Sequence, residues 1–173
     1  MKDPAVKEFD EATFAKLKDA AFENGTIEVK VLSRLLSDAP DFARGFIGVA
    51  FRISDDNSQF ECIYVRPANS RSEDQVRRNH SIQYFAYPDF KFQRLRKEFP
   101  ESYESYADMG LNEWIDLRIV VKGSQARLFV NGQEQPSLVV NDLKLGAGGS
   151  GGVGLFVDVG TEGFFRDLKI HHD

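Results

Sequence analysis

The sequence has little cysteine, no long apolar run and no cluster of positive charge, which disulfide-bonded, membrane-spanning and nucleic-acid-binding proteins respectively require. Cys62 is the only cysteine among 173 residues, so no disulfide can form within the chain and the redox state of its compartment is not indicated. Cys62 lies in an apolar strand pattern with no obvious His or Asn partner nearby, and we interpret it as a small buried hydrophobe rather than a nucleophile.

Long apolar runs are also missing. No segment approaches the roughly 20 apolar residues of a transmembrane helix, so we predict no membrane span. The N-terminus has no basic and apolar stretch typical of a secretory signal. The cellular compartment is therefore not predicted, and an extracytoplasmic location is compatible with the sequence if an N-terminal signal was removed.

Positive charge is sparse and dispersed. Lys and Arg number 22 against 27 Asp and Glu, which gives a net charge of −5. Phosphate binding requires clustered basic side chains, so we predict no nucleic-acid partner. The densest basic run, residues 91–97, lies beside Glu98 and Glu101, and we interpret it as a solvated loop or helix face.

Phenylalanine is abundant, with 15 residues, and most of it recurs at alternating positions that suit the core between two sheets. Alternation of apolar and polar residues predicts successive strands. These cover residues 26–32, 45–53, 60–66, 81–87, 112–121, 126–130, 137–140 and 151–170, the last broken by the turn at 160–163 into a hairpin. No helix of regular length separates them, which excludes a βαβ architecture and predicts an all-β antiparallel two-sheet sandwich.

The chain divides into two parts by composition. Residues 1–21 favour a short helix or an edge segment because they have little β-branching. Residues 22–173 form the predicted sandwich, which we expect to be a single domain.

Alternation also predicts a candidate binding surface. If the apolar side chains of each strand face the core, a set of polar side chains faces outward. Planar multi-donor groups and aromatic rings of this kind bind sugar hydroxyls and sugar ring faces. The set is Arg52, Tyr64, Arg66, Gln83 and Arg118. Cross-strand pairing is the alternative, with Arg66 paired to Glu61, Glu28 or Asp116.

Several segments resemble a known superfamily. They are Gly45–Arg52, Phe60–Asn69, Ile82–Tyr84, Trp114–Val121, Ala126–Gly132 and Gly152–Phe156. Together they resemble the concanavalin A-like lectin/glucanase superfamily, and most of all bacterial laminin G-like domains related to the 3-keto-disaccharide hydrolase domain family. The resemblance implies a jelly-roll sandwich that binds a carbohydrate or glycan-like ligand. It also adds Asn69, from the Arg66-Pro-Ala-Asn69 string, to the site, with a turn-forming Asn as the alternative.

Two other functions stay open. One is a glycoside-processing hydrolase or lyase akin to the 3-keto-disaccharide hydrolases, and the other is a laminin G-like protein-interaction module. Retaining glucanases of the superfamily carry alternating carboxylates on a strand, whereas the nearest string here, Glu8–Glu11, lacks the last Glu. We therefore assign no catalytic residue and lean against an enzyme.

The sequence also gives no firm metal or acid–base site. Asp55–Asn57 is the densest oxygen-rich candidate for calcium, and a plain turn is the favoured interpretation. His80 follows a long polar loop and suits acid–base chemistry near neutral pH, although a lone loop His is usually solvated. We predict no metal and no cofactor.

Overall fold

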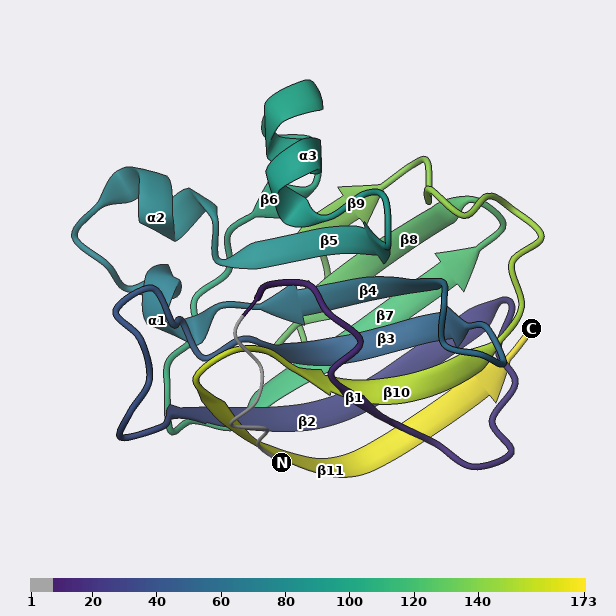
Figure 1. Ribbon diagram of the computed structural model, residues 1–173, viewed down its shortest axis with the longest axis horizontal. Coiled ribbons are helices and arrows are strands. Elements are labelled where there is room, and N and C mark those ends of the chain that lie inside the picture. The colour runs from purple at the N-terminus through teal and green to yellow at the C-terminus, as the bar shows by residue number, and fades with distance from the viewer. Residues whose placement is uncertain (1–7) are drawn as a thin grey trace.

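The computed structural model describes residues 8–173, which form two antiparallel sheets packed face to face (Figure 1). The six-stranded sheet, in front in Figure 1, has the order β1-β10-β3-β4-β5-β6, and the five-stranded sheet behind it has the order β11-β2-β7-β8-β9. This architecture confirms the predicted lectin-like β-sandwich.

The strands follow the predicted alternation closely. Their bounds are β1 Phe14–Lys16, β2 Gly25–Leu35, β3 Ile47–Ile53, β4 Phe60–Val65, β5 Ile82–Tyr87, β6 Glu104–Ser105, β7 Ile115–Lys122, β8 Gln125–Val130, β9 Leu138–Val140, β10 Gly152–Val157 and β11 Thr161–His172. The hairpin predicted at 151–170 is therefore β10 and β11, but its two strands belong to different sheets.

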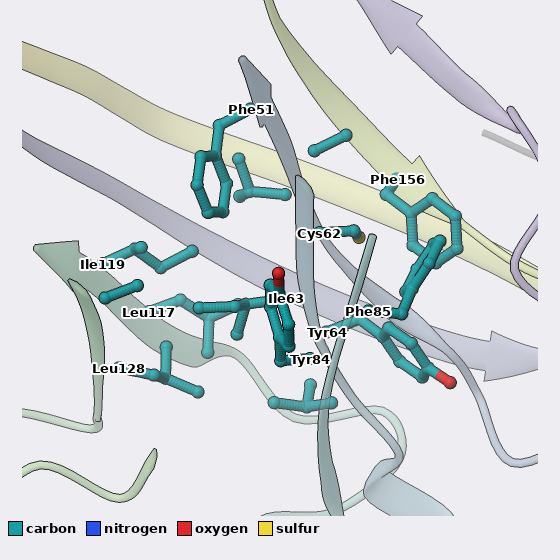
Figure 2. Close-up of a cluster of buried hydrophobic side chains, with 14 of the residues drawn as sticks. Phe51, Cys62, Ile63, Tyr64, Tyr84, Phe85, Leu117, Ile119, Leu128 and Phe156 are labelled. Atoms are coloured by element: carbon teal, nitrogen blue, oxygen red, sulfur yellow. The ribbon is translucent and has the colours of Figure 1, made fainter. Parts of the chain in front are cut away.

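The core between the sheets comes from one face of each. Figure 2 shows Phe51 and Ile63 of the six-stranded sheet directed toward Leu117, Ile119 and Leu128 of the five-stranded sheet. All five side chains are buried. In β7 the exposure alternates with the sequence, as expected of a strand with one face on a core and one face outward.

The outer face of the six-stranded sheet is buried as well. Every residue of β3 and β4 is buried, on both faces. In Figure 2 Cys62, Tyr64, Phe85 and Phe156 lie on the opposite side of the sheet from Ile63. The N-terminal segment, dark purple in Figure 1, crosses in front of this face and adds Phe9 and Phe14 to its aromatic contacts.

Of the two forms expected for residues 1–21, a short helix or an edge segment, residues 8–21 form the edge segment and no helix; residues 1–7 lie outside the described part of the chain. In this segment, β1 pairs antiparallel with β10, with Phe14 opposite Phe156. An edge strand offers unpaired backbone groups to any neighbouring segment. Pairing with β10 and burial of Phe14 against Phe60 outweigh the weak helix propensity here.

The helices are short and lie in the connections. They are α1 Pro67–Ser70, α2 Gln75–Asn79 and α3 Phe92–Glu98. α1 and α2 occupy the long polar loop after β4, and α3 lies in the segment after β5 that was expected to be irregular or briefly helical (Figure 1). No helix in residues 8–173 is long and apolar enough to cross a membrane.

Arg52 does not have the outward position predicted for it. β3 carries an extra residue opposite β10, where the register shifts between Gly152 and Gly154, and Arg52 has a positive φ of 52°. The bulge turns the side chain into the end of the sandwich. There the guanidinium donates to three backbone carbonyls, those of Glu23, Gly123 and Gly146, at 2.8–3.0 Å.

Replacing Arg52 by methionine tests this structural role. The Arg52→Met variant keeps much of the length but leaves three carbonyl groups without their donor, so we expect the free energy of unfolding to fall by about 2–4 kcal/mol. Urea unfolding measures the change. Arg127→Met, at an exposed position on β8, is the matched control and should change stability little. Equal stabilities for the two variants would contradict the role.

Candidate functional site

Arg66 occupies the centre of a polar cluster on the outer face of the six-stranded sheet. It follows β4 directly and is 4% exposed. One terminal nitrogen donates to Glu104 Oε1 at 2.9 Å and to the His80 carbonyl at 3.2 Å. The other donates to Tyr64 Oη at 2.8 Å and to Gln83 Oε1 at 3.1 Å. The guanidinium is therefore held in one orientation by four partners.

Glu104 balances this charge. Its carboxylate accepts from Arg66 and from Arg96, which α3 supplies from the other side. Burial raises the pKa of the Glu104 carboxyl, but hydrogen bonds and charge from Arg96 and Arg66 hold that pKa below its ordinary value. Glu104 is thus an ionised partner of two arginines and is unsuited to donate a proton near neutral pH.

A pocket opens beside this cluster. Its volume is about 170 Å³. Its lining combines aromatic rings with positive charge and consists of Phe9, Phe42, Arg44, Phe46, Arg66, Asn69, Arg77, His80, Phe92 and Arg96. We call it the Arg66 pocket. The N-terminal segment contributes Phe9, which packs against Phe42, Phe46 and Phe92 at ring distances of 5.1–5.4 Å.

Asn69 and His80 meet at the pocket wall. Asn69, in α1, donates its side-chain amide to the His80 carbonyl at 3.0 Å, while its Oδ1 is buried without a hydrogen-bond partner. Such buried unpaired acceptors are rare in folded proteins. The His80 ring lies 3.7 Å from a carboxylate oxygen of Glu101 and 3.7 Å from one of Glu104.

Two further carboxyl groups are buried where the N-terminal segment packs on the sheet: Asp10 belongs to that segment, and Asp158 follows β10. The Asp10 backbone N–H donates to Asp158 Oδ2 at 2.9 Å, and Asp10 Oδ2 accepts from the Phe92 N–H at 2.6 Å. Burial raises the pKa of Asp10 to about 7 and that of Asp158 to about 6. Neither carboxyl lines the Arg66 pocket.

The predicted site residues do not share one surface. Tyr64 and Gln83 meet Arg66, as opposite residues of β4 and β5, but both are fully buried and hold Arg66 from behind. Arg66 and Asn69 reach the pocket, and Arg52 does not. Arg66 pairs with Glu104 rather than with the alternatives considered from the sequence, Glu61, Glu28 or Asp116.

Arg118 faces outward from the other sheet, where its guanidinium lies 3.9 Å from the centre of the Phe129 ring. It lines a separate groove of about 240 Å³ whose charges are mixed. Lys30 and Asp116, which also line the groove, pair at 3.3 Å. Because β7 belongs to the five-stranded sheet, no rotation of a side chain could bring Arg118 to Arg66.

The calcium candidate is a hydrogen-bonded turn. The Asp56 carboxylate accepts from the hydroxyls of Ser54 and Ser58 and from the Ser58 backbone N–H, which lowers its pKa to about 2. Among residues 8–173, no group of three His, Cys, Asp or Glu side chains converges as a metal site would require.

Sequence reasoning missed most of the pocket lining. Arg77 lies in the long polar loop after β4, and Arg96 in the basic run at 91–97 that was interpreted as a solvated face. Phe42 and Arg44 precede β3. These residues come from connections far apart in the chain, and no spacing in the sequence relates them.

Comparison with known proteins places the fold among lectin-like sandwiches. No family model matches the sequence, and no curated protein matches it. The structure resembles the carbohydrate binding module CBM66 from Bacillus subtilis, with a TM-score of 0.58 and 16% identity over 87% of this chain and 76% of that one.

Two other solved structures match as broadly. The galectin LEC-6 from Caenorhabditis elegans has a TM-score of 0.53 and 12% identity, over 95% of each chain. A candidate glycosyl hydrolase from Parabacteroides distasonis has a TM-score of 0.52 and 14% identity, over 99% of this chain and 92% of that one. Identities this low show the shared fold alone.

The buried pair Asp10 and Asp158 gives stability a pH dependence. Both pKa values lie above the ordinary 3.8, so between about pH 4 and 7 the folded protein holds protons that the unfolded chain has released. Stability therefore falls as pH rises through this window, by on the order of 7 kcal/mol for the two groups together, at about 1.36 kcal/mol per pKa unit. Urea unfolding between pH 4.5 and 8 measures the slope.

The Asp10→Asn variant should make this slope shallower, because Asn keeps an acceptor for the Phe92 N–H but cannot ionise, while Asp158 still titrates. Asp38→Asn, at an exposed position, is the control and should keep the wild-type slope. A free energy of unfolding that rises from pH 5 to pH 7 would contradict the proposal that the Asp10 and Asp158 carboxyl groups are protonated in the folded protein at pH 5.

Proposed function

We propose that this chain is a carbohydrate-binding β-sandwich that holds a glycan in the Arg66 pocket. One observation carries the proposal: aromatic rings and guanidinium groups, among them the firmly held Arg66, line the same cavity. Guanidinium groups offer paired donors to hydroxyl oxygens, and aromatic faces cover the apolar side of a sugar ring.

The exposed member of the aromatic set suits a ligand contact. Phe42 is 45% exposed at the pocket, and its ring packs on Phe9 at 5.1 Å. Behind these rings, Arg66 is orientated before any ligand arrives, which reduces the entropy lost on binding.

The size of the pocket limits what it can enclose. Its 170 Å³ is below the roughly 300–1,000 Å³ typical of sites for drug-sized ligands. We therefore propose that it takes a single sugar residue, such as the end of a glycan chain, while the rest of the ligand extends into solvent. Sandwiches of the same fold named a carbohydrate binding module and a galectin support a saccharide as the ligand class.

Catalysis has less support. Glycoside hydrolysis uses two carboxyl groups on opposite sides of the scissile bond, and the pocket lining contains none. Asp10, which belongs to the N-terminal segment, and Asp158 are both buried. A hydrolase akin to the 3-keto-disaccharide hydrolases would require that segment, and Asp10 with it, to move.

A laminin G-like interaction module would use the other sheet. Trp114 and Phe164 are exposed there, 39% and 37% respectively, and each is covered by an arginine, Arg166 and Arg34. Leu35 of β2 and Val139 of β9 are exposed on the same sheet as well. The groove on this sheet has one aromatic ring and mixed charges in its lining, whereas the Arg66 pocket combines several rings with positive charge, so we favour the saccharide ligand.

Removing the exposed ring tests the binding proposal. Phe42→Ala should weaken binding of the best ligand from a glycan array by at least about tenfold, equivalent to about 1.4 kcal/mol, because the sugar face loses its cover. Isothermal titration calorimetry measures the change. Phe164→Ala, which removes an exposed ring from the far sheet, should bind normally. Loss of binding in the control alone, or no glycan bound at millimolar concentration, would refute the proposal.

A further inference from the structure

The Arg66 pocket has more positive charge than its own carboxylates balance. Four arginines line it, Arg44, Arg66, Arg77 and Arg96, and no carboxylate does. Glu104, behind the lining, pairs with two of them, Arg66 and Arg96. This concentration of positive charge occurs in a chain whose net charge is −5.

Neither of the other two arginines forms an ion pair with a carboxylate of residues 8–173. Arg44 donates to the backbone carbonyls of Asp41 and Ala43, and the Arg77 side chain has no hydrogen-bond or ion-pair partner in residues 8–173. Partial burial lowers the pKa of Arg44, the nearby charges of Arg77 and Arg66 lower it further, and the charge of Asp41 opposes this lowering. Like charges brought together in this way repel unless an anion enters between them.

The aromatic rings add a second requirement. Phe42 lines the same pocket and is 45% exposed, so its ring is free to cover the apolar face of a sugar. The pocket therefore suits a negative group and a sugar ring in one small molecule.

We propose that the ligand of the Arg66 pocket is an acidic saccharide, a sugar residue that carries a carboxylate or a sulfate group. Arg44 and Arg77 pair with the anionic group, and the Phe42 ring covers the apolar face of the sugar. Arginine suits this task because its planar fork matches carboxylate and sulfate oxygens in pairs. This inference rests on the proposed carbohydrate-binding function and specifies its ligand class.

Matched sugars test the inference. Titration calorimetry compares glucuronate with glucose, galacturonate with galactose, and glucose 6-sulfate with glucose; sodium acetate and sodium sulfate serve as probes of bare anion binding. We expect at least one acidic sugar to bind tenfold or more tightly than its neutral partner. Its affinity should fall as salt rises from 50 to 500 mM, because ions screen the attraction. Whether the carboxylate or the sulfate sugar binds identifies the anionic group.

Two variants locate the effect. Arg77→Gln and Arg44→Gln should each reduce the preference for the acidic sugar at least fivefold, while Arg127→Gln on the far sheet should leave it unchanged. Neither pocket arginine holds the fold through an ion pair, so thermal unfolding should stay close to wild type.

The failures of the two proposals are distinguishable. Neutral sugars that bind as tightly as acidic ones would overturn the acidic ligand and keep the carbohydrate-binding function. Sulfate or acetate alone binding as tightly as the acidic sugar would also overturn the inference, since the pocket would then be a bare anion site. No binding of any sugar, acidic or neutral, would overturn the function and the inference together.

Discussion

The structure depends on one constraint: both faces of the six-stranded sheet are removed from water. The inner face packs on the five-stranded sheet, and the N-terminal segment with the connection after β5 covers the outer face. A polar side chain on that outer face therefore has to find its partners inside the protein. Arg66 does so with Tyr64, Gln83 and Glu104, which ties β4 to β5 and β6.

The cover also determines where a ligand can reach the sheet. Phe9 closes the aromatic layer over Phe46 and Phe92, and beyond it the pocket leaves the edge of the polar cluster accessible. Arg66 supplies a fixed charge at this edge, whereas Arg77 and Arg96 come from short helices in the connections. The sheet thus holds Arg66 in a fixed position, and the connecting loops supply the other groups that a ligand would contact.

Alternation in the sequence located the longer strands, because a one-residue shift would reverse every side chain. The short edge strands β1 and β6 were not predicted, since two or three residues carry no alternating pattern. Alternation also placed Tyr64 and Gln83 on the same face, where the structure makes them opposite residues. Their burial could not be predicted from these strands alone, because it comes from the N-terminal segment. A signal was nevertheless present: Gly48 and Ala50 on the second face of β3, and Phe46 just before it, are small or apolar, which is typical of a strand covered on both sides. The bulge at Arg52 and the arginines of the loops depend on tertiary packing and left no pattern in the sequence.

Chemical-shift mapping tests most directly whether the Arg66 pocket is the binding site. Isotopically labelled protein is titrated with a panel of neutral and acidic monosaccharides, and the perturbed backbone and side-chain N–H signals are assigned. The account predicts that the largest shifts occur at Asn69, Arg77 and His80, around the pocket. Shifts centred instead on Arg118 and Phe129, in the groove of the five-stranded sheet, would contradict it.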